Sequence, residues 1–125
     1  MNNKKYDIHE RIFRFIVKVI NFTKKLPRNP QNLVILGQIL NSVTSMGAND
    51  QEADGSLTKK DFVHCFVIVR KEGKETNFWL KLIGATNPQF ETEASVLIKE
   101  GEEIVAIVSQ IITNTRNKDP NIENL

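Results

Sequence analysis

The sequence predicts an all-α protein, an antiparallel up-down-up-down bundle of four helices. Apolar residues recur at spacings of three and four in four long segments, which is the period of an amphipathic helix. Proline or glycine stands between successive segments, and no segment alternates apolar and polar residues as a strand does. Four such segments joined by short loops within 125 residues fit one bundle domain, spanning residues 1–116.

The first helix is expected over residues 7–26, ending before Pro27 because proline disfavours a helical residue in front of it. Its apolar stripe is Ile8, Ile12, Phe15, Val19, Phe22 and Leu26. The second helix is expected over 31–54 and ends at the stop signal Asp54-Gly55. Its stripe is Leu33, Leu36, Leu40, Val43 and Gly47, widened by Ile35 and Ile39.

The third helix is expected over residues 58–86, with Ser56 or Thr58 as the N-cap and Asn87-Pro88 as the end. Its main stripe is Phe62, Phe66, Val69, Gly73, Thr76, Leu80 and Ile83, and a second apolar stripe is Val63, Val67, Phe78, Trp79 and Leu82. The fourth helix is expected over 90–116, with the stripe Ala94, Leu97, Gly101, Ile104, Val108, Ile111 and Thr115. Residues 117–125 are expected to form a flexible tail.

The composition excludes several classes of protein. No apolar run approaches the about 20 residues of a membrane span, and the polar N-terminus lacks the apolar core of a secretory signal. Cys65 is the only cysteine, so an internal disulfide is impossible and a buried thiol in a reducing compartment is expected. We therefore expect a cytoplasmic protein without membrane contact.

Charge is distributed unevenly along the chain. Residues 1–28 hold eight basic against two acidic side chains, whereas residues 87–125 hold three basic against seven acidic ones. Such asymmetry can mark a nucleic-acid-binding face, or it can belong to two solvated helix faces that neutralise each other as neighbours. The candidate nucleic-acid-binding residues are Lys4, Lys5, Arg11, Arg14, Lys18, Lys24, Lys25 and Arg28. No aromatic residue is interleaved with these basic residues on an obviously exposed face.

Small and polar residues cluster in the second helix, in the stretch S-V-T-S-M-G-A-N-D-Q-E-A. Ser42, Ser45, Asn49 and Glu52 follow a 3-4-3 spacing and are expected to form an inward polar cluster of structural, not catalytic, character. Glycine inside a helix costs up to about 1 kcal/mol, so close helix contacts should compensate for it. Such contacts are expected at Gly37, Gly47, Gly73 and Gly101.

No arrangement of residues predicts catalysis. A di-metal bundle site needs Glu-x-x-His pairs, and the chain has none, although Asp61-x-x-His64 and Glu72-x-x-Glu75 are related spacings. Neither His9 nor His64 follows an arginine at ribonuclease spacing, and Cys65 lies within the apolar run CFVIV. The glycines form no phosphate-binding loop. We expect a non-enzyme without cofactor, metal or small-molecule substrate.

Three motifs give the chain a resemblance to a known family. The stretch S-V-T-S-M-G-A-N-D-Q-E-A, then T-K-K-D-F, then K-E-G-K-E-T-N-F-W-L resembles the signature of the proteins encoded in intervening sequences of bacterial 23S ribosomal RNA genes. The opening Y-D-I-H-E-R-I-F-x-F and the Leu26-Pro27 step also fit, so the resemblance covers about residues 6 to 115. The family often has basic residues where this chain has Asn41, Cys65, Val67 and Asn77, and alanine at the position of Ser56.

The resemblance implies a four-helix bundle that assembles into a ring-shaped homo-oligomer, a pentamer, without assigned enzymatic activity. It also implies that Glu72, Glu75 or both face inward, and we include both with Trp79 in the inward polar cluster. Trp79 is expected in the core with its indole N–H hydrogen-bonded. Two functions remain open: an oligomer that associates with ribosomal RNA or other nucleic acid through a basic face, or a protein-interaction scaffold that binds no nucleic acid.

Overall fold

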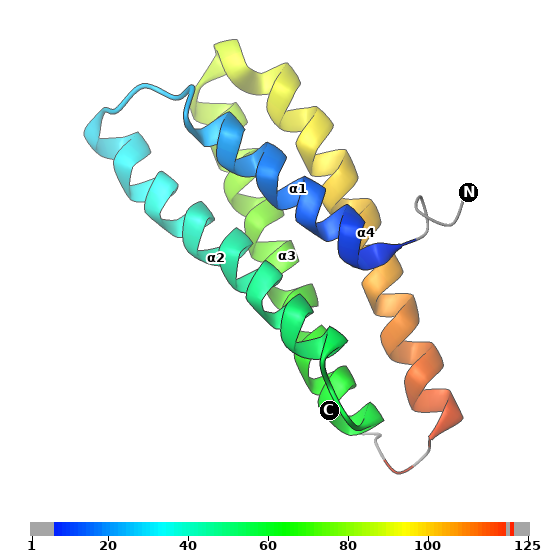
Figure 1. Ribbon diagram of the computed structural model, residues 1–125. Coiled ribbons are helices and arrows are strands. Elements are labelled where there is room, and N and C mark those ends of the chain that lie inside the picture. Colours follow the sequence, from blue (N-terminus) through cyan, green and yellow to red (C-terminus); the bar gives the residue numbers. More distant parts are fainter. Residues whose placement is uncertain (1–6, 120, 122–125) are drawn as a thin grey trace.

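The computed structural model describes residues 7–119 and 121, and these residues form a four-helix bundle (Figure 1). Its elements are α1 (Ile8–Thr23), α2 (Pro30–Asp54), α3 (Lys59–Thr86), the 3₁₀ turn η2 (Pro88–Phe90) and α4 (Glu91–Lys118). The described part of the chain contains no strand, so the predicted all-α class is confirmed. Lys4, Lys5 and most of the predicted tail lie outside the described residues.

The helices alternate in direction around the bundle. His9 at the start of α1 bonds Asp50 near the end of α2, and Asn32 at the start of α2 bonds Asn87 just after α3. Gly84 near the end of α3 packs against Ala94 near the start of α4. Each helix is therefore antiparallel to the next, and α1 lies beside both α2 and α4 (Figure 1).

Side-chain caps set the start of three helices. Asp7 accepts hydrogen bonds from the backbone N–H groups of His9 and Glu10, and Asn29 accepts one from Asn32. Thr58, rather than Ser56, caps α3 by accepting from the N–H of Asp61. Such oxygens satisfy amide donors that the first turn of a helix leaves free, so the local sequence fixes these starts.

Two helix ends differ from the prediction. α1 ends at Thr23, three residues before the expected position, because residues 24–26 form a turn ahead of Pro27 that still buries Leu26. α4 continues to Lys118, two residues further than expected, with Arg116 and Lys118 in its last turn. Cations at that end suit the negative pole of the helix dipole.

The core follows the predicted stripes in three helices and departs from them in α2. The predicted stripe of α1 is buried throughout, and most of the main stripes of α3 and α4 are buried too. In α2, however, Leu33 is 53% exposed and Leu40 only half-buried. The buried apolar residues there are Ile35, Leu36, Ile39, Val43, Met46 and Ala53. The apolar pattern of α2 is too broad to identify the buried side, and packing against α3 as well as α1 selects it.

Close helix contacts occur at three of the four predicted glycines. A Cβ on Gly47 would lie 2.7 Å from Ile16 Cδ1, and one on Gly73 would lie 3.0 Å from Val105 Cγ2. A Cβ on Gly101 would meet the side chains of Asn77 and Phe15. At Gly37 nothing lies within 4 Å, so the prediction is wrong there. Gly47 is therefore required by a tight contact between α1 and α2.

Candidate nucleic-acid interface

Arg11 is the most strongly paired of the candidate basic residues. Its Nε and Nη2 donate to the two carboxylate oxygens of Glu100 at 3.2 and 2.7 Å, and Nη2 also donates to Glu103 at 2.8 Å. These hydrogen bonds, led by the one to Glu100, raise the pKa of Arg11 above its usual range. The guanidinium joins α1 to α4 and is not available to a phosphate.

Two further candidates are paired with carboxylates at the surface. Arg14 Nη2 lies 2.6 Å from Glu10 one turn earlier in α1, and Lys25 Nζ lies 2.6 Å from Glu93 of α4. Exposed pairs of this kind contribute up to about 1 kcal/mol, so a competing phosphate could replace them. As the structure stands, their charge is locally compensated.

Lys18, Lys24 and Arg28 remain without a carboxylate partner within 4.0 Å in the described part of the chain. All three are exposed. Arg28 donates to the backbone carbonyl of Thr23 at 3.3 Å, at the C-terminal end of α1. Of the eight predicted residues, these three are the ones in the described chain without a carboxylate partner.

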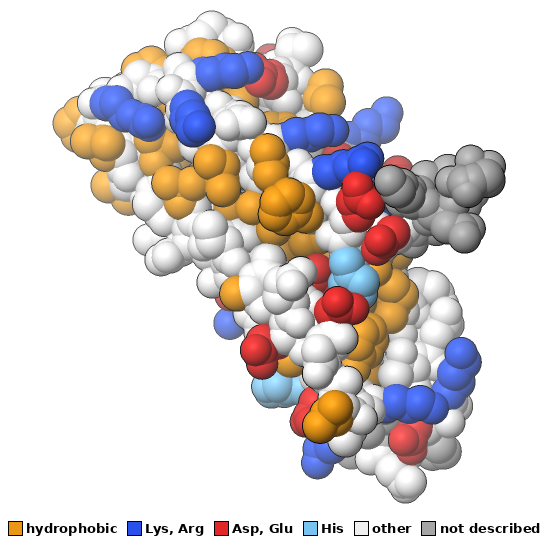
Figure 2. All heavy atoms as spheres, in the orientation of Figure 1, with side chains coloured by type: hydrophobic (Ala, Val, Ile, Leu, Met, Phe, Trp, Pro, Cys, Tyr) orange, Lys and Arg blue, Asp and Glu red, His pale blue; other side chains and the backbone are white. Residues whose placement is uncertain are grey.

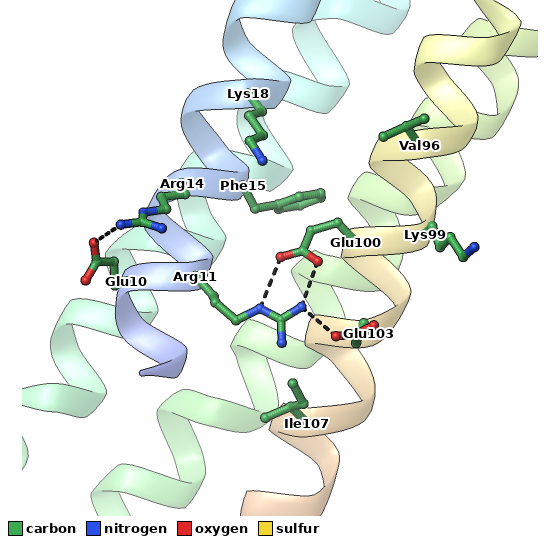
Figure 3. Close-up of a pocket in the computed structure, with 10 residues that line it drawn as sticks. All are labelled: Glu10, Arg11, Arg14, Phe15, Lys18, Val96, Lys99, Glu100, Glu103 and Ile107. Atoms are coloured by element: carbon green, nitrogen blue, oxygen red, sulfur yellow. Dashed lines mark hydrogen bonds and ion pairs between the residues drawn. The ribbon is translucent and has the colours of Figure 1, made fainter. Parts of the chain in front are cut away.

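A groove between α1 and α4 runs past the paired arginine (Figure 3). It has a volume of about 950 Å³, and Lys18 and Val96 point into it above Phe15, whereas Arg11 and Glu100 bridge it. The residues that line it are Glu10, Arg11, Arg14, Phe15, Lys18, Val96, Lys99, Glu100, Glu103 and Ile107. Three carboxylates among them make the groove itself a poor anion site.

Charge is separated along the bundle axis. One residue from each helix marks the middle of the bundle axis: Phe15, Ser42, Thr76 and Gly101. We divide the molecule into two ends at this point. Residues 16–41 and 77–100 hold six basic and three acidic residues, whereas residues 7–15, 42–76 and 101–119 hold nine basic and eleven acidic ones. Figure 2 shows basic side chains gathered over the end with the α1–α2 turn, which we call the basic end.

Of the predicted inward polar cluster, only Ser42 is fully buried. The Ser42 hydroxyl is buried and lies 2.8 Å from the Thr76 hydroxyl of α3, and each also bonds a carbonyl of its own helix. Ser45 and Asn49 are half-buried, and Asn49 Nδ2 donates to the Ser45 carbonyl. Glu52 is exposed, so its predicted inward position is wrong. At 100° per residue, the face centred on Ser45 lies to the side of the core direction set by Val43 and Met46.

The α3 members of that cluster are placed mainly at the surface. Glu75 is exposed, which corrects its inward assignment, whereas Glu72 is half-buried. Burial, and then the nearby charge of Glu75, raise the pKa of Glu72. Trp79 is half-buried against the core, and no residue in the described part of the chain accepts a hydrogen bond from its indole N–H. The expected packing of Trp79 against the core is therefore confirmed in part, and the expected hydrogen bond to a protein group is absent among the described residues.

Two polar pairs between helices, one buried and one partly buried, were not predicted from the sequence. The amides of Asn32 and Asn87 exchange hydrogen bonds of 2.9 and 3.1 Å, and Asn32 also donates to the Pro27 carbonyl. The pair ties the α1–α2 turn to the end of α3. Asn87 precedes Pro88 and Asn32 is two residues after Pro30, both at helix boundaries where asparagine is interpreted as a local cap, so no local signal shows that they meet.

The second missed pair joins α1 to α2. His9 Nδ1 lies 2.7 Å from the carboxylate of buried Asp50, and His9 Nε2 lies 3.3 Å from Asp54. The imidazole also packs against the ring of Phe66. Burial raises the pKa of Asp50, and the hydrogen bond from His9 opposes that shift. Asp50 and Asp54 are one helical turn apart, so they share a helix face. This spacing is the sequence signal that could have predicted a shared partner such as His9.

The remaining reactive groups give no sign of catalysis. Burial raises the pKa of the Cys65 thiol, which keeps it in the less nucleophilic protonated form. No group of three or more His, Cys, Asp or Glu side chains among residues 7–119 and 121 could hold a metal ion. Within the same residues, none of the helices combines the length and hydropathy that a membrane crossing requires.

Comparison with known proteins gives the family. The sequence profile of the 23S rRNA-intervening sequence protein family matches residues 4–110. The chain belongs to this family. Its fold is similar to the crystal structure of a protein of unknown function from the S23 ribosomal protein family of Bacteroides thetaiotaomicron, with 30% identity and a TM-score of 0.77. That similarity covers 85% of this chain and 95% of the other. No curated protein matches the chain.

Proposed function

We propose that this family member is a non-enzymatic, cytoplasmic, homo-oligomeric protein that associates with 23S ribosomal RNA or other nucleic acid. The observation that carries the proposal is the basic end, where Lys18, Lys24 and Arg28 are exposed without a carboxylate partner in the described chain. Phosphate contacts from such side chains give affinity with little sequence preference and strong dependence on salt. The family name refers to 23S rRNA, which makes ribosomal RNA the nucleic acid to test first.

An uncharged face supports assembly into an oligomer. No charged residue occurs from Pro30 to Asn49, and this stretch of α2 exposes Leu33 and Val34. The neighbouring α1 exposes Phe13 and Val17, and hydrophobic side chains gather over both helices in Figure 2. Contiguous exposed apolar surface favours burial against another protein surface. We assign this α1–α2 face to the contact between copies and extend the proposal to a pentameric ring.

Light scattering on the purified protein tests the assembly. The expected mass is five times 14.3 kDa, and Val34→Glu should shift it toward the monomer by placing a charge in the apolar contact. Leu57→Glu is the matched control, because Leu57 is 98% exposed in the loop between α2 and α3 and lies outside the stretches of α1 and α2 that form the proposed contact. A monomeric wild-type protein at tens of micromolar would overturn the oligomer.

Fluorescence anisotropy tests the association with RNA. A labelled 23S rRNA hairpin and a random duplex are compared at low and physiological salt. The triple variant Lys18→Glu, Lys24→Glu, Arg28→Glu should lose binding, whereas Lys59→Glu with Lys60→Glu, at the opposite end, should retain it. Arg14→Glu with Lys18→Glu, on one face of α1, should weaken binding and spare assembly. No binding by the wild-type protein at physiological salt would overturn the RNA association.

A specific observation favours the second candidate, a protein-interaction scaffold that binds no nucleic acid. Arg11, Arg14 and Lys25 are already compensated by glutamates, so the basic face is weaker than the sequence indicates. In the scaffold, the oligomer would present its helix faces to a protein partner. Intact assembly together with absent RNA binding is the outcome that selects this function.

A further inference from the structure

The outer face of α3 carries a second basic surface, one that the analysis of charge along the chain did not single out. Val67, Lys71, Lys74, Phe78, Lys81 and Ala85 follow a 4-3-4-3-4 spacing and so lie along one side of the helix. All but Val67 are exposed. We call Lys71, Lys74, Phe78 and Lys81 the α3 stripe. It spans about 15 Å, since a helix rises 1.5 Å per residue.

The lysines of the α3 stripe form no close ion pair. No carboxylate lies within 4.0 Å of Lys71, Lys74 or Lys81 in the described part of the chain. Exposed Glu75 borders the stripe, one helical turn after Lys71 and next to Lys74, whereas half-buried Glu72 lies further round the helix. The stripe thus carries three lysines against one bordering carboxylate. The stripe therefore presents positive charge to solvent.

Phe78 stands between two of these lysines as an exposed aromatic ring. Its side chain is 55% exposed, and its ring meets Trp79 edge-on, with centroids 4.9 Å apart at 71°. Trp79 in turn packs against the core. A phenyl ring held on a rigid helix by a partly buried indole is a preformed surface. An exposed ring also stands among the N-terminal basic residues, where none was expected, because Phe13 next to Arg14 is 65% exposed.

Cations in a row with an exposed ring match one ligand chemistry. Lysines contact the phosphates of a nucleic-acid backbone, and an aromatic ring stacks on any base. Bases in a duplex are stacked inside it and cannot reach a ring on a helix surface, so the ring selects unpaired nucleotides. We infer that the α3 stripe is a binding site for single-stranded RNA, with Phe78 as the stacking residue. The inference rests on the proposed association with RNA and adds the form of RNA and the site.

The test compares a fluorescein-labelled single-stranded oligouridylate with an RNA duplex of the same length. Phe78→Leu keeps an apolar side chain without a π face and should weaken single-strand binding about 10-fold, within the range that loss of one base-stacking contact causes. Duplex binding should change less than two-fold. Phe78→Trp should restore single-strand affinity, and circular dichroism should show unchanged helix content for both variants.

Two further readouts separate stacking from general electrostatics. Lys74→Ala and Lys81→Ala should each lower the slope of log affinity against log salt by about 0.7 for the single strand. Lys60→Ala, an exposed lysine near the start of α3 and outside the stripe, is the matched control. Oligouridylate should also quench the fluorescence of Trp79, the only tryptophan, because a base on Phe78 lies near the indole.

The outcomes distinguish this inference from the proposal it extends. Equal single-strand affinity of Phe78→Leu and the wild-type protein overturns the inference, whatever the lysine variants do. If the triple variant at the basic end then still abolishes RNA binding, the proposed function stands without the α3 site. Absence of binding to either RNA by the wild-type protein overturns both. Loss of single-strand binding in Phe78→Leu, with retained duplex binding and rescue by Phe78→Trp, is the result expected.

Discussion

α1 and α3 both carry several basic residues, but the tertiary structure treats them differently. In α1, Arg11 pairs with Glu100 and Glu103 of α4, and Arg14 pairs with Glu10 of the same helix. Lys25, just after α1, pairs with Glu93 of α4. The exposed lysines of α3 face solvent on the far side of that helix from the core. The N-terminal segment 1–28, with eight basic against two acidic side chains, is therefore more compensated by ion pairs among its described residues than α3, with six basic against three. Net charge of a segment does not report the charge that a ligand would meet.

The largest expected effect concerns how α1 is held. Phe15 is almost fully buried, and its ring packs against Gly101 of α4. Phe15→Ala should therefore lower the free energy of unfolding by about 3 to 5 kcal/mol. Urea denaturation followed by circular dichroism measures it. A cost below 1 kcal/mol would mean that ion pairs, and not the core, hold α1.

Gly101 gives the next largest effect, because α1, α3 and α4 meet there. Gly101→Ala places a methyl group against Phe15 and Asn77 and should cost about 1 to 3 kcal/mol. Gly37→Ala is the control: nothing lies within 4 Å, and the gain in helix propensity should stabilise by up to about 1 kcal/mol. Thermal denaturation should shift in opposite directions for the two variants, and a shift in the same direction would contradict the close contact.

Comparison of one cation from each helix sharpens the contrast directly. Arg11→Met leaves Glu100 and Glu103 unpaired and should destabilise by about 1 to 2 kcal/mol, whereas Lys74→Met should change stability by less than about 0.5 kcal/mol. The effect of Arg11→Met should shrink in 1 M salt because the ion pair is partly exposed. Equal effects of the two variants in urea titrations would remove the distinction between the helices.

The smallest effect is a pH dependence at the start of α1. Burial raises the pKa of Asp50 above its ordinary value of 3.8, so the folded protein holds this proton more tightly than the unfolded chain. The contribution of Asp50 to stability is therefore present below pH 3.8 and declines as the pH rises through the raised pKa. Asp50→Asn should flatten this decline in urea midpoints measured between about pH 3 and pH 7. Asp54→Asn, at an exposed carboxylate, is the control, and an unchanged slope in Asp50→Asn would contradict the assignment.

Local pattern was sufficient for the helices and insufficient for the polar contacts. Apolar spacing and the caps Asp7, Asn29 and Thr58 act within one helix, so they can be read from the chain. The hydroxyl pair of Ser42 and Thr76 was predicted only in part, because the sequence indicated an inward Ser42 but did not identify Thr76 as its hydrogen-bond partner. The amide pair of Asn32 and Asn87 joins residues 55 positions apart, and nothing in either segment indicates the other.

The candidate interface shows the same limit. The eight basic residues of the first segment could be named from the sequence, but pairing divided them, leaving Lys18, Lys24 and Arg28 without carboxylates among those described. Phe78 was assigned to an apolar stripe, because spacing cannot tell a buried second stripe from an exposed one. Its exposure depends on where α2 and α4 lie around α3.

The sequence by itself determined the all-α class, the number of helices and the family, because periodicity, caps, chain breaks and signature motifs are local properties. Only the tertiary structure decided which side of α2 is buried, which cations meet carboxylates and which aromatic ring faces solvent. These depend on the rotation of each helix about its axis. That rotation is set by the fit of several neighbours at once, such as Phe15 and Asn77 at Gly101, and no single segment contains it.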